Sequence, residues 1–454
     1  MRNAIARIWL PALVAIIGCG AAPEPAARGP KVQNVIIVLV DTLRADHIGT
    51  YGYERQTSPY LDEFAAGAVV FEHARSQSSC TFPSVNSLMT SRYPDVFARQ
   101  GPGQFGIPDK YPAIAEILNN NGYHTVAVSA SAIVRDTPSK RNPNGGFGRG
   151  FDQFIEGCVW RHGACVNRKI FQALKTLEEP FFLYLHYMEP HARYQPHPKY
   201  EKKFAGPYDG FDFIEQGNPK PISKMLYADG PKVEITDRDI QHLVDLYDDE
   251  IRYFDDVFRR LFGRLEALGQ LDETIIVFAS DHGEEFLEHG HINHCRGVWN
   301  TVTHVPLFLK IPGVDGRRLE VAVQNLDIVP TILDYLAING EDFGFEGKSL
   351  RPFIERRAES SRFAFSRQTG VYSADDGRFH LILDASSDRF TLFDIGKDPL
   401  EQSDLFDPAH PEFGPLKSAL DGWLEQTSKR MHLRDSIAAD RAKEEELRAL
   451  GYLE

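Results

Sequence analysis

The chain has 454 residues, an apolar fraction of 42%, a charged fraction of 25% and a formal net charge of -14. These values are typical of a globular protein with one large domain and a smaller one. The net negative charge argues against nucleic acid or an anionic membrane surface as the main partner, although a metal or a few cations could still dominate a pocket for an anionic substrate.

The first residues indicate an export signal rather than a part of the fold. Arg2 and Arg7 precede a short apolar run that ends in Ile-Ile-Gly-Cys at residues 16–19 and is too short to span a bilayer comfortably. This ending looks like a bacterial lipobox, in which Cys19 becomes the lipidated first residue. The alternative is a plain secretory signal that is cleaved nearby. Both interpretations predict an exported, periplasmic or cell-envelope protein, whose only membrane contact in the first case is a lipid anchor.

An Ala/Pro-rich linker is expected over residues 20–33, after the signal of residues 1–19. Disulfides persist in exported proteins. Cys158 and Cys165 flank a short loop and could pair locally, whereas free buried thiols are the alternative for Cys80 and Cys295.

An unbroken aliphatic run over residues 35–40 predicts a strand buried on both faces, as in the middle of a parallel sheet. The run ends at Asp41. Ligands of open α/β sheets bind beyond the carboxyl ends of the strands, so Asp41 would lie where a metal or a substrate binds. The alternative is an aspartate that caps the following turn.

Helices and strands alternate along the rest of the large domain. Helices are expected at 58–66, from just beyond Thr81, at 113–121 and at 237–268, and strands at 69–71, 125–129, 181–186, 274–280 and 305–309. This alternation predicts an α/β catalytic domain over residues 34–345, with a large, mostly parallel sheet flanked by helices.

Towards the C-terminus, the alternation of predicted helices and strands gives way to short apolar runs. Short apolar runs at 379–383 and 390–393 predict a small antiparallel-sheet subdomain over residues 346–429, and a charged helix is expected over 430–454. Two irregular stretches, 137–150 and 205–236, are expected to be loops above the strand ends, where substrate specificity is set.

Three predicted strands end in residues that bind metals or phosphate. Asp41 ends the first, His186 ends a later one shortly before His191, and Asp281 with His282 ends another. Carboxylate and imidazole groups from separate strand ends can surround a divalent cation, which no single strand can do. One such residue alone is more often structural. The prediction of a metal site therefore depends on several strand ends that carry such residues.

Six segments carry a family resemblance over almost the whole mature chain. They cover residues 34–52, 81–94, 186–194, 280–312, 327–333 and 392–401. With these segments in this order, the chain resembles the sulfatases of the alkaline-phosphatase superfamily. The resemblance implies that Asp41, Asp281 and His282 bind a catalytic divalent cation, which could be Ca²⁺, Mn²⁺ or Zn²⁺. It also implies that His191 faces the ester group or its leaving oxygen, and that His294 lies where the family has a second basic contact.

The nucleophile region departs from the family pattern. Formylglycine sulfatases carry Cys-x-Pro-Ser-Arg, whereas this chain has Thr-Phe-Pro-Ser-Val at residues 81–85. Cys80 stands one place too early and is not expected to become formylglycine. Thr42 replaces the family's second aspartate, the lysine of the Gly-Lys-Trp-His segment is absent from residues 121–127, and Cys295 stands near the position of another lysine.

Thr81 is the expected nucleophile, because a hydroxyl bound to a divalent metal is more acidic than an unbound one and a helix start favours anions. Threonine lacks the aldehyde-hydrate route for expelling sulfate. Phosphate and phosphonate esters are therefore favoured over sulfate esters as the expected substrates. The expected function is hydrolysis of an anionic ester of a small molecule, glycan or lipid, with a histidine as acid or base.

Two alternatives stay open: a phosphoryl-group transferase acting on an envelope acceptor, and a catalytically inactive sulfatase-like binding protein. Such transferases usually carry several transmembrane helices, which this chain lacks beyond its signal, and an inactive protein need not keep metal ligands. Two pairs also remain ambiguous. Arg44 and Asp46 could shape the first loop or form a structural salt bridge, and His289 and His291 could bind a second metal or be solvated.

Overall fold

The computed structural model describes residues 32–94, 106–107, 110–159, 162–192, 194, 197, 200, 203–210, 235–358 and 362–428. The predicted signal over 1–19, most of the linker, most of the loop over 205–236 and the predicted helix over 430–454 lie outside the described residues. Within them, no helix is long and apolar enough to cross a membrane.

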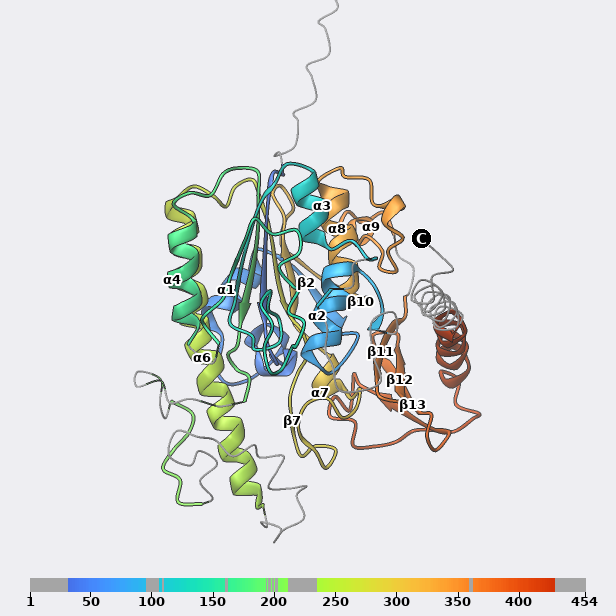
Figure 1. Ribbon diagram of the computed structural model, residues 1–454. Helices are drawn as coiled ribbons and strands as arrows, with labels where there is room; N and C mark the ends of the chain where they lie inside the picture. Colours follow the sequence, from blue (N-terminus) through green and yellow to red (C-terminus); the bar gives the residue numbers. More distant parts are fainter. Residues whose placement is uncertain are drawn as a thin grey trace, which may run out of the picture.

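An eight-stranded sheet forms the centre of the large domain, in the order β10-β2-β9-β6-β1-β5-β3-β4 (Figure 1). Only β9 runs antiparallel to its two neighbours among these described strands, so the predicted mostly parallel sheet is confirmed. The strands are β1 (Asn34–Val40), β2 (Val69–Arg75), β3 (His124–Ser129), β4 (Gln153–Ile155), β5 (Phe181–Tyr187), β6 (Thr274–Ser280), β9 (Leu307–Lys310) and β10 (Arg317–Gln324).

The central strand β1 is fully buried because helices cover both faces of the sheet. Alternate residues enter two separate cores: Ile36 and Val38 point to one face, and Val35 and Ile37 to the other. The first core contains α1 (Pro59–Ala66), α4 (Gly163–Ala173) and α6 (Asp237–Ala267), and the second contains α2 (Thr81–Thr90), α3 (Ile114–Asn120), α8 (Ile328–Tyr335) and α9 (Arg351–Ile354) (Figure 1).

Helix α1 begins at Pro59, close to the predicted start, and is capped by a residue far away in the sequence. The Ser58 side chain makes no capping hydrogen bond. Instead, the carboxylate of Asp255 on α6 accepts the backbone N–H groups of Tyr60 and Leu61 at 3.0 and 2.8 Å. A long-range partner therefore satisfies the first turn, which sequence patterns near Ser58 could not reveal.

The C-terminal part forms the predicted small antiparallel sheet, in the order β11-β12-β13-β14. A helix over residues 413–428 packs on it through Leu416, Leu420 and Trp423. Arg75 on β2 and Asp375 on β12, both 1% exposed, form an ion pair at 2.5 Å that ties the small sheet to the large one. The strands are β11 (Ala364–Gln368), β12 (Val371–Asp375), β13 (Phe379–Asp384) and β14 (Arg389–Asp394).

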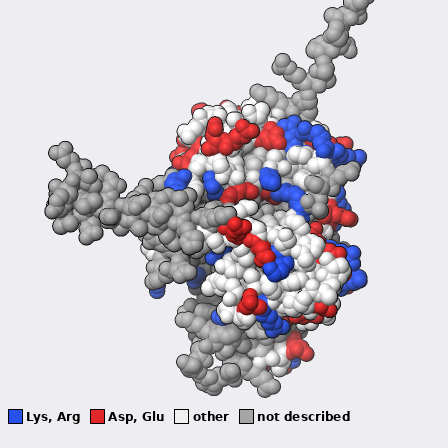
Figure 2. Space-filling view, turned by 90° about the vertical axis from the view of Figure 1, so that its right-hand side faces the viewer, with Lys and Arg blue, Asp and Glu red and all other residues white. Residues whose placement is uncertain are grey.

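Figure 2 shows the side of the molecule that faces right in Figure 1. Acidic and basic side chains are interspersed over its described surface. This face therefore presents a mixed rather than a single-sign field to a partner.

Short elements complete the described fold around the strand ends. A two-stranded hairpin lies between β6 and β9, and 3-10 turns follow β1, β10 and α8. They are β7 (Glu285–Phe286), β8 (Ile292–Asn293), α7 (Asn300–Thr303), η1 (Ala45–His47), η2 (Gly49–Tyr51), η4 (Asn325–Asp327) and η5 (Glu341–Phe343).

Two disulfides join the four described cysteines. Cys158 and Cys165 pair locally, as the sequence suggested, across a separation of 7 residues. Cys80 and Cys295 are also bonded, across 215 residues, so the interpretation of these two as free thiols is wrong. The long separation hid this pair, because only the folded sheet brings the start of α2 next to the segment after β8.

Candidate active site

Asp41, Asp281 and His282 come together at the carboxyl edge of the large sheet. Strands β1 and β6 are parallel neighbours with Val40 paired to Ser280, so the residues that follow them lie side by side. One ligand atom from each of the three residues lies within 4.8 Å of the others. All three side chains are at most 1% exposed.

The polar atoms of this cluster are arranged as a cation would require. Asp281 Oδ1 accepts the N–H groups of Thr42 and His282 at 3.1 and 2.9 Å. Asp41 Oδ1 and Asp281 Oδ2, however, are buried without a hydrogen-bond partner in the described part of the chain. His282 donates its Nδ1–H to the Gly283 carbonyl at 3.0 Å, which leaves the Nε2 lone pair on the side of these oxygens, 3.8 and 3.5 Å away. Two carboxylate oxygens and one imidazole lone pair fit a divalent metal.

The electrostatics of the cluster are unbalanced without a cation. Burial and the charge of Asp41 raise the pKa of Asp281. For Asp41, the neighbouring histidines His191, His186 and His282 outweigh burial and hold its pKa below the usual range. Burial lowers the pKa of His282 to about 3, so its ring is neutral at pH 7 and able to bind a metal.

Thr81 is the first residue of α2 and lies against this cluster. Its Oγ1 is 3.2 Å from His282 Nε2. Ser84, one turn further along α2, donates its hydroxyl to the Asp281 carbonyl at 2.5 Å and so fixes the helix start to the end of β6. The N-terminal end of α2 thus presents both a hydroxyl and a positive helix end to the carboxylates.

Two further histidines lie beside the cluster with opposite electrostatics. His294 follows β8, and its Nδ1 lies 3.0 Å from the fully buried carboxylate of Glu284, which outweighs burial and raises the pKa of His294. His191 donates Nδ1–H to the Ala192 carbonyl at 3.0 Å, and burial lowers its pKa. The two ring centroids are 5.1 Å apart. A proton donor and a proton acceptor therefore face the same space.

The predicted loop over 137–150 contributes a cation near these histidines. Arg141 is exposed, and its charge lowers the pKa of His294, against the larger effect of Glu284. The charges of Arg141 and Glu284 therefore act on the same histidine with opposite sign.

His186, which the sequence analysis places at a strand end of this site, and two residues that the sequence did not indicate support the cluster. His186 lies 3.3 Å from Asp41 Oδ2 and 3.0 Å from the Tyr184 hydroxyl, so it orients Asp41. Asn325 donates to the Ser280 carbonyl at 2.8 Å, and its Oδ1 has no partner among the described residues. Glu284 carried no recognisable signal because its partner His294 is ten residues away in a hairpin.

The two ambiguous pairs have distinct outcomes. Arg44 is buried and forms ion pairs with Asp46 at 2.7 Å and with Glu288 at 2.5 Å, as the salt-bridge alternative stated. His289 lies 2.7 Å from Glu285. Neither His289 nor His291 belongs to a metal-type cluster of the described residues.

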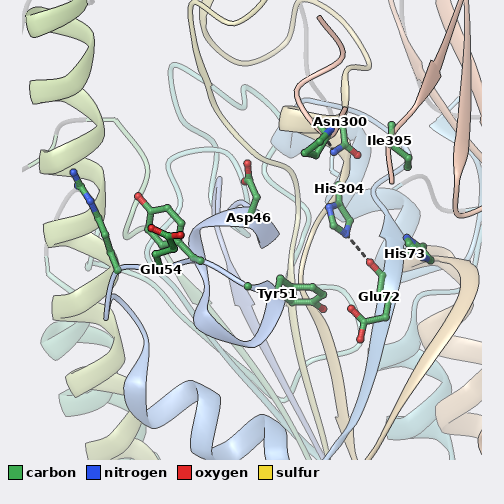
Figure 3. A pocket seen from close by; sticks show the side chains of 12 residues that line it. Asp46, Tyr51, Glu54, Glu72, His73, Asn300, His304 and Ile395 are labelled. Carbon is green, nitrogen blue, oxygen red and sulfur yellow. Dashed lines mark hydrogen bonds between the residues drawn. The ribbon is translucent and has the colours of Figure 1, made fainter. Parts of the chain in front are cut away.

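A cavity of about 520 Å³ lies beside the first loop rather than at the cluster (Figure 3). Asp46, Tyr51 and His304 are among the residues that line it. His304 donates Nε2–H to the Glu72 carbonyl at 2.8 Å, and burial lowers its pKa to about 4. Neither Thr81 nor Asp281 lines this cavity, so it is separate from the candidate active site.

A mostly parallel sheet with carboxylates at its strand ends is typical of the hydrolases of the alkaline-phosphatase superfamily. The model that describes the sulfatase family matches residues 33–338, and the chain belongs to this family. It is 25% identical over 433 residues to the ulvan-active sulfatase of Formosa agariphila, covering 87% of this chain and 81% of that protein. It is 25% identical over 367 residues to iduronate 2-sulfatase of Homo sapiens, covering 67% and 64%.

A solved structure shows the same fold. The phosphonate monoester hydrolase of Agrobacterium radiobacter matches with a TM-score of 0.68 and 19% identity, over 88% of this chain and 96% of that one. The family-model match confirms the family resemblance seen in the sequence, and the solved structure confirms the predicted fold class.

Proposed function

We propose that the protein is an exported, metal-dependent hydrolase of phosphate, phosphonate or sulfate esters in which Thr81 is the nucleophile. The observation that supports this most is the position of the Thr81 hydroxyl, 3.2 Å from His282 Nε2 and at the first residue of α2. The neighbouring cysteine, Cys80, is bonded to Cys295, which argues against a cysteine-derived nucleophile.

Asp41, Asp281 and His282 would hold the cation. Bound there, a divalent metal supplies Lewis-acid polarisation of the ester and neutralises charge on its nonbridging oxygens. The imidazole makes the donor set softer than an all-oxygen calcium cage, so Mn²⁺ and Zn²⁺ fit it better than Ca²⁺.

In the first half-reaction, Thr81 Oγ1 forms a bond to phosphorus or sulfur while the bond to the leaving oxygen breaks. His191, whose pKa is lowered, accepts the threonine proton, and His294, whose pKa is raised, donates a proton to the leaving oxygen. In the second half-reaction, neutral His294 accepts a proton from water while the water oxygen bonds to phosphorus or sulfur. The bond from Thr81 Oγ1 to that atom breaks, and His191 returns its proton to Thr81.

The substrate class is an anionic ester. The exposed Arg141 lies close enough to affect His294 and would attract a negative group. A threonine ester favours phosphoryl over sulfuryl transfer, because threonine cannot expel sulfate as an aldehyde hydrate does. The fold shared with phosphonate monoester hydrolases is consistent with this preference.

The two disulfides support the exported location, because such bonds are rare in reducing compartments. We propose lipidation at Cys19, with replacement by serine as its test. The wild-type protein should fractionate with membranes and the Cys19→Ser variant should not.

An assay of the protein without residues 1–19 tests the reaction. An aryl phosphate monoester, an aryl phosphodiester, an aryl phosphonate and an aryl sulfate are offered with Mn²⁺, Zn²⁺ or Ca²⁺ to the wild type, Thr81→Ala and Thr81→Ser. Phosphoester or phosphonate turnover should fall by about 10⁴-fold or more in Thr81→Ala, as expected for loss of a nucleophile, and should partly persist in Thr81→Ser.

Mass analysis of the quenched wild-type reaction should show a phosphoryl group on the peptide that contains Thr81. Unchanged turnover in Thr81→Ala would mean that another group attacks. A metal-loaded wild type that turns over none of the four esters would favour the binding-protein alternative.

A further inference from the structure

A second cluster of metal-type side chains lies outside the candidate active site. His162 immediately precedes α4, Glu189 follows β5, and His197 lies in the segment between β5 and α6. One ligand atom from each of the three lies within 4.8 Å of the others. Figure 1 shows α4 beside α6, and Asn167 on α4 donates to the Val257 carbonyl on α6 at 2.8 Å, so the two helices frame the cluster.

Glu189 is an unbalanced buried charge in this cluster. It is 5% exposed, and its Oε1 accepts the backbone N–H of Gly163. Its Oε2 is buried with no hydrogen-bond partner in the described part of the chain. Burial and the nearby charge of Glu250 raise the pKa of Glu189 to about 7. A cation bound between this orphaned carboxylate oxygen and the two imidazoles would give the oxygen the partner it lacks.

The two imidazoles are held in place by aromatic and carboxylate contacts. The His197 ring stacks on Tyr253 of α6, with centroids 3.7 Å apart and planes at 9°, and lies 4.3 Å from the His162 ring. His197 Nε2 is 2.8 Å from Glu250 Oε2. A carboxylate that holds a histidine ring in this way is the usual support of a metal-binding imidazole.

We infer that His162, Glu189 and His197 form a second divalent-cation site, separate from the catalytic one, which takes Zn²⁺ and uses Glu250 to orient His197. Two imidazoles and a carboxylate are donors that zinc prefers over calcium or magnesium. His162 is only partly buried, which gives the ion a path from solvent. The inference does not depend on the proposed ester hydrolysis.

The site has a consequence for the catalytic residues. Glu189 precedes His191 by two positions. An ion held by Glu189 would therefore connect the segment that contains His191 to the start of α4 through His162, and to α6 through His197 and Glu250. The bound ion would act as a structural clamp on these elements.

Zinc titration of the metal-free full-length protein tests the inference. Binding of Zn²⁺ alone is followed calorimetrically and by competition with a chelating dye, in the wild type, His162→Ala, His197→Ala and Asp281→Asn. The wild type should bind two equivalents and Asp281→Asn should keep one. His162→Ala, which alters a partly exposed side chain, should weaken that second equivalent by about 10- to 100-fold.

His242→Ala is the matched control, because His242 lies on α6, stacked on Tyr208 and away from the cluster. It should bind zinc as the wild type does. Far-UV circular dichroism establishes that each variant is folded, and the visible absorption of Co²⁺ in Asp281→Asn reports imidazole ligation at the second site. Failure of folded Asp281→Asn to bind zinc, or unchanged zinc affinity in both His162→Ala and His197→Ala, would overturn the inference.

Discussion

Two clusters of histidine and carboxylate in this protein differ in how the chain builds them. Asp41, Asp281 and His282 follow adjacent parallel strands and are held by the rigid sheet. The second cluster, His162, Glu189 and His197, is assembled from a helix start and two connecting segments. Sheet register alone can position ligands at strand ends, whereas ligands on connecting segments need extra restraints.

Each cluster has a disulfide beside it. Cys80–Cys295 joins the residue before Thr81 to the residue after His294, and Cys158–Cys165 lies around the start of α4, where His162 stands. The first bond links segments 215 residues apart and the second only 7 residues apart. The two bonds therefore restrain the chain on very different scales.

Among substitutions in the two clusters, the largest effect on activity is expected from Asp281→Asn. Asparagine keeps the acceptor for the Thr42 and His282 N–H groups but removes a ligand charge, so kcat/KM should fall by about 10³-fold or more. The metal-free variant should unfold at a higher temperature than the metal-free wild type, because it no longer places two buried carboxylates together. Steady-state kinetics and thermal unfolding with and without chelator measure both effects.

Asp255→Asn provides the control for that variant. Asp255 is also a buried aspartate, with its pKa raised to about 6 by burial, but it caps α1 and lies away from the cluster. Its replacement should leave kcat/KM and metal content unchanged. Equal loss of activity in both variants would mean that Asp281 acts through stability alone.

A smaller effect is expected from Glu284→Gln. This variant tests the proton donor, His294, independently of the proton acceptor, His191. The Glu284 carboxylate raises the pKa of His294, so its loss should lower that pKa. His294 donates its proton only when protonated, so the alkaline limb of the pH profile of kcat/KM should move to lower pH. The acid limb, set by deprotonation of His191, should move less. The maximum of kcat/KM should fall by about 10-fold.

Glu285→Gln is the matched change for this experiment. Glu285 is a buried glutamate next to Glu284 that contacts His289 at 2.7 Å instead of His294. Its replacement should leave the alkaline limb in place. A limb that moves equally in both variants would assign the proton donor to a group other than His294.

The same contrast explains what could be predicted from the sequence. The apolar run before Asp41 and the one before Asp281 identified buried parallel strands, and parallel strands end at one edge, so their convergence was predictable. Strand β10 was missed because alternate residues of its first half, such as Arg318, are exposed and charged at the sheet edge.

Contacts between distant segments left no local pattern in the sequence. The second cluster was missed because His162 lies 27 positions before Glu189 (189 minus 162) and comes close to it only in the folded chain. The Cys80–Cys295 bond and the cap of α1 by Asp255 were missed for the same reason.

The smallest effect on activity is expected from removal of the disulfides, which tests whether the two clusters are restrained separately. Removing Cys80–Cys295 with Cys80→Ser/Cys295→Ser should lower kcat/KM only several-fold, because Cys295 N–H still donates to the Ser79 carbonyl at 2.9 Å. Its effect on stability should be large, since chain-entropy arguments give about 5 kcal/mol for a loop of this length and about 2.5 kcal/mol for the loop closed by Cys158–Cys165.

Cys158→Ser/Cys165→Ser is the matched pair of substitutions. It should lower the unfolding free energy less than Cys80→Ser/Cys295→Ser does, but it should weaken zinc binding by the second cluster, because His162 lies between the two cysteines in sequence. Urea unfolding and zinc titration of both double variants measure this crossed pattern. If both pairs changed zinc affinity equally, the two clusters would not be restrained separately, and the contrast between sheet-held and segment-held ligands would fail.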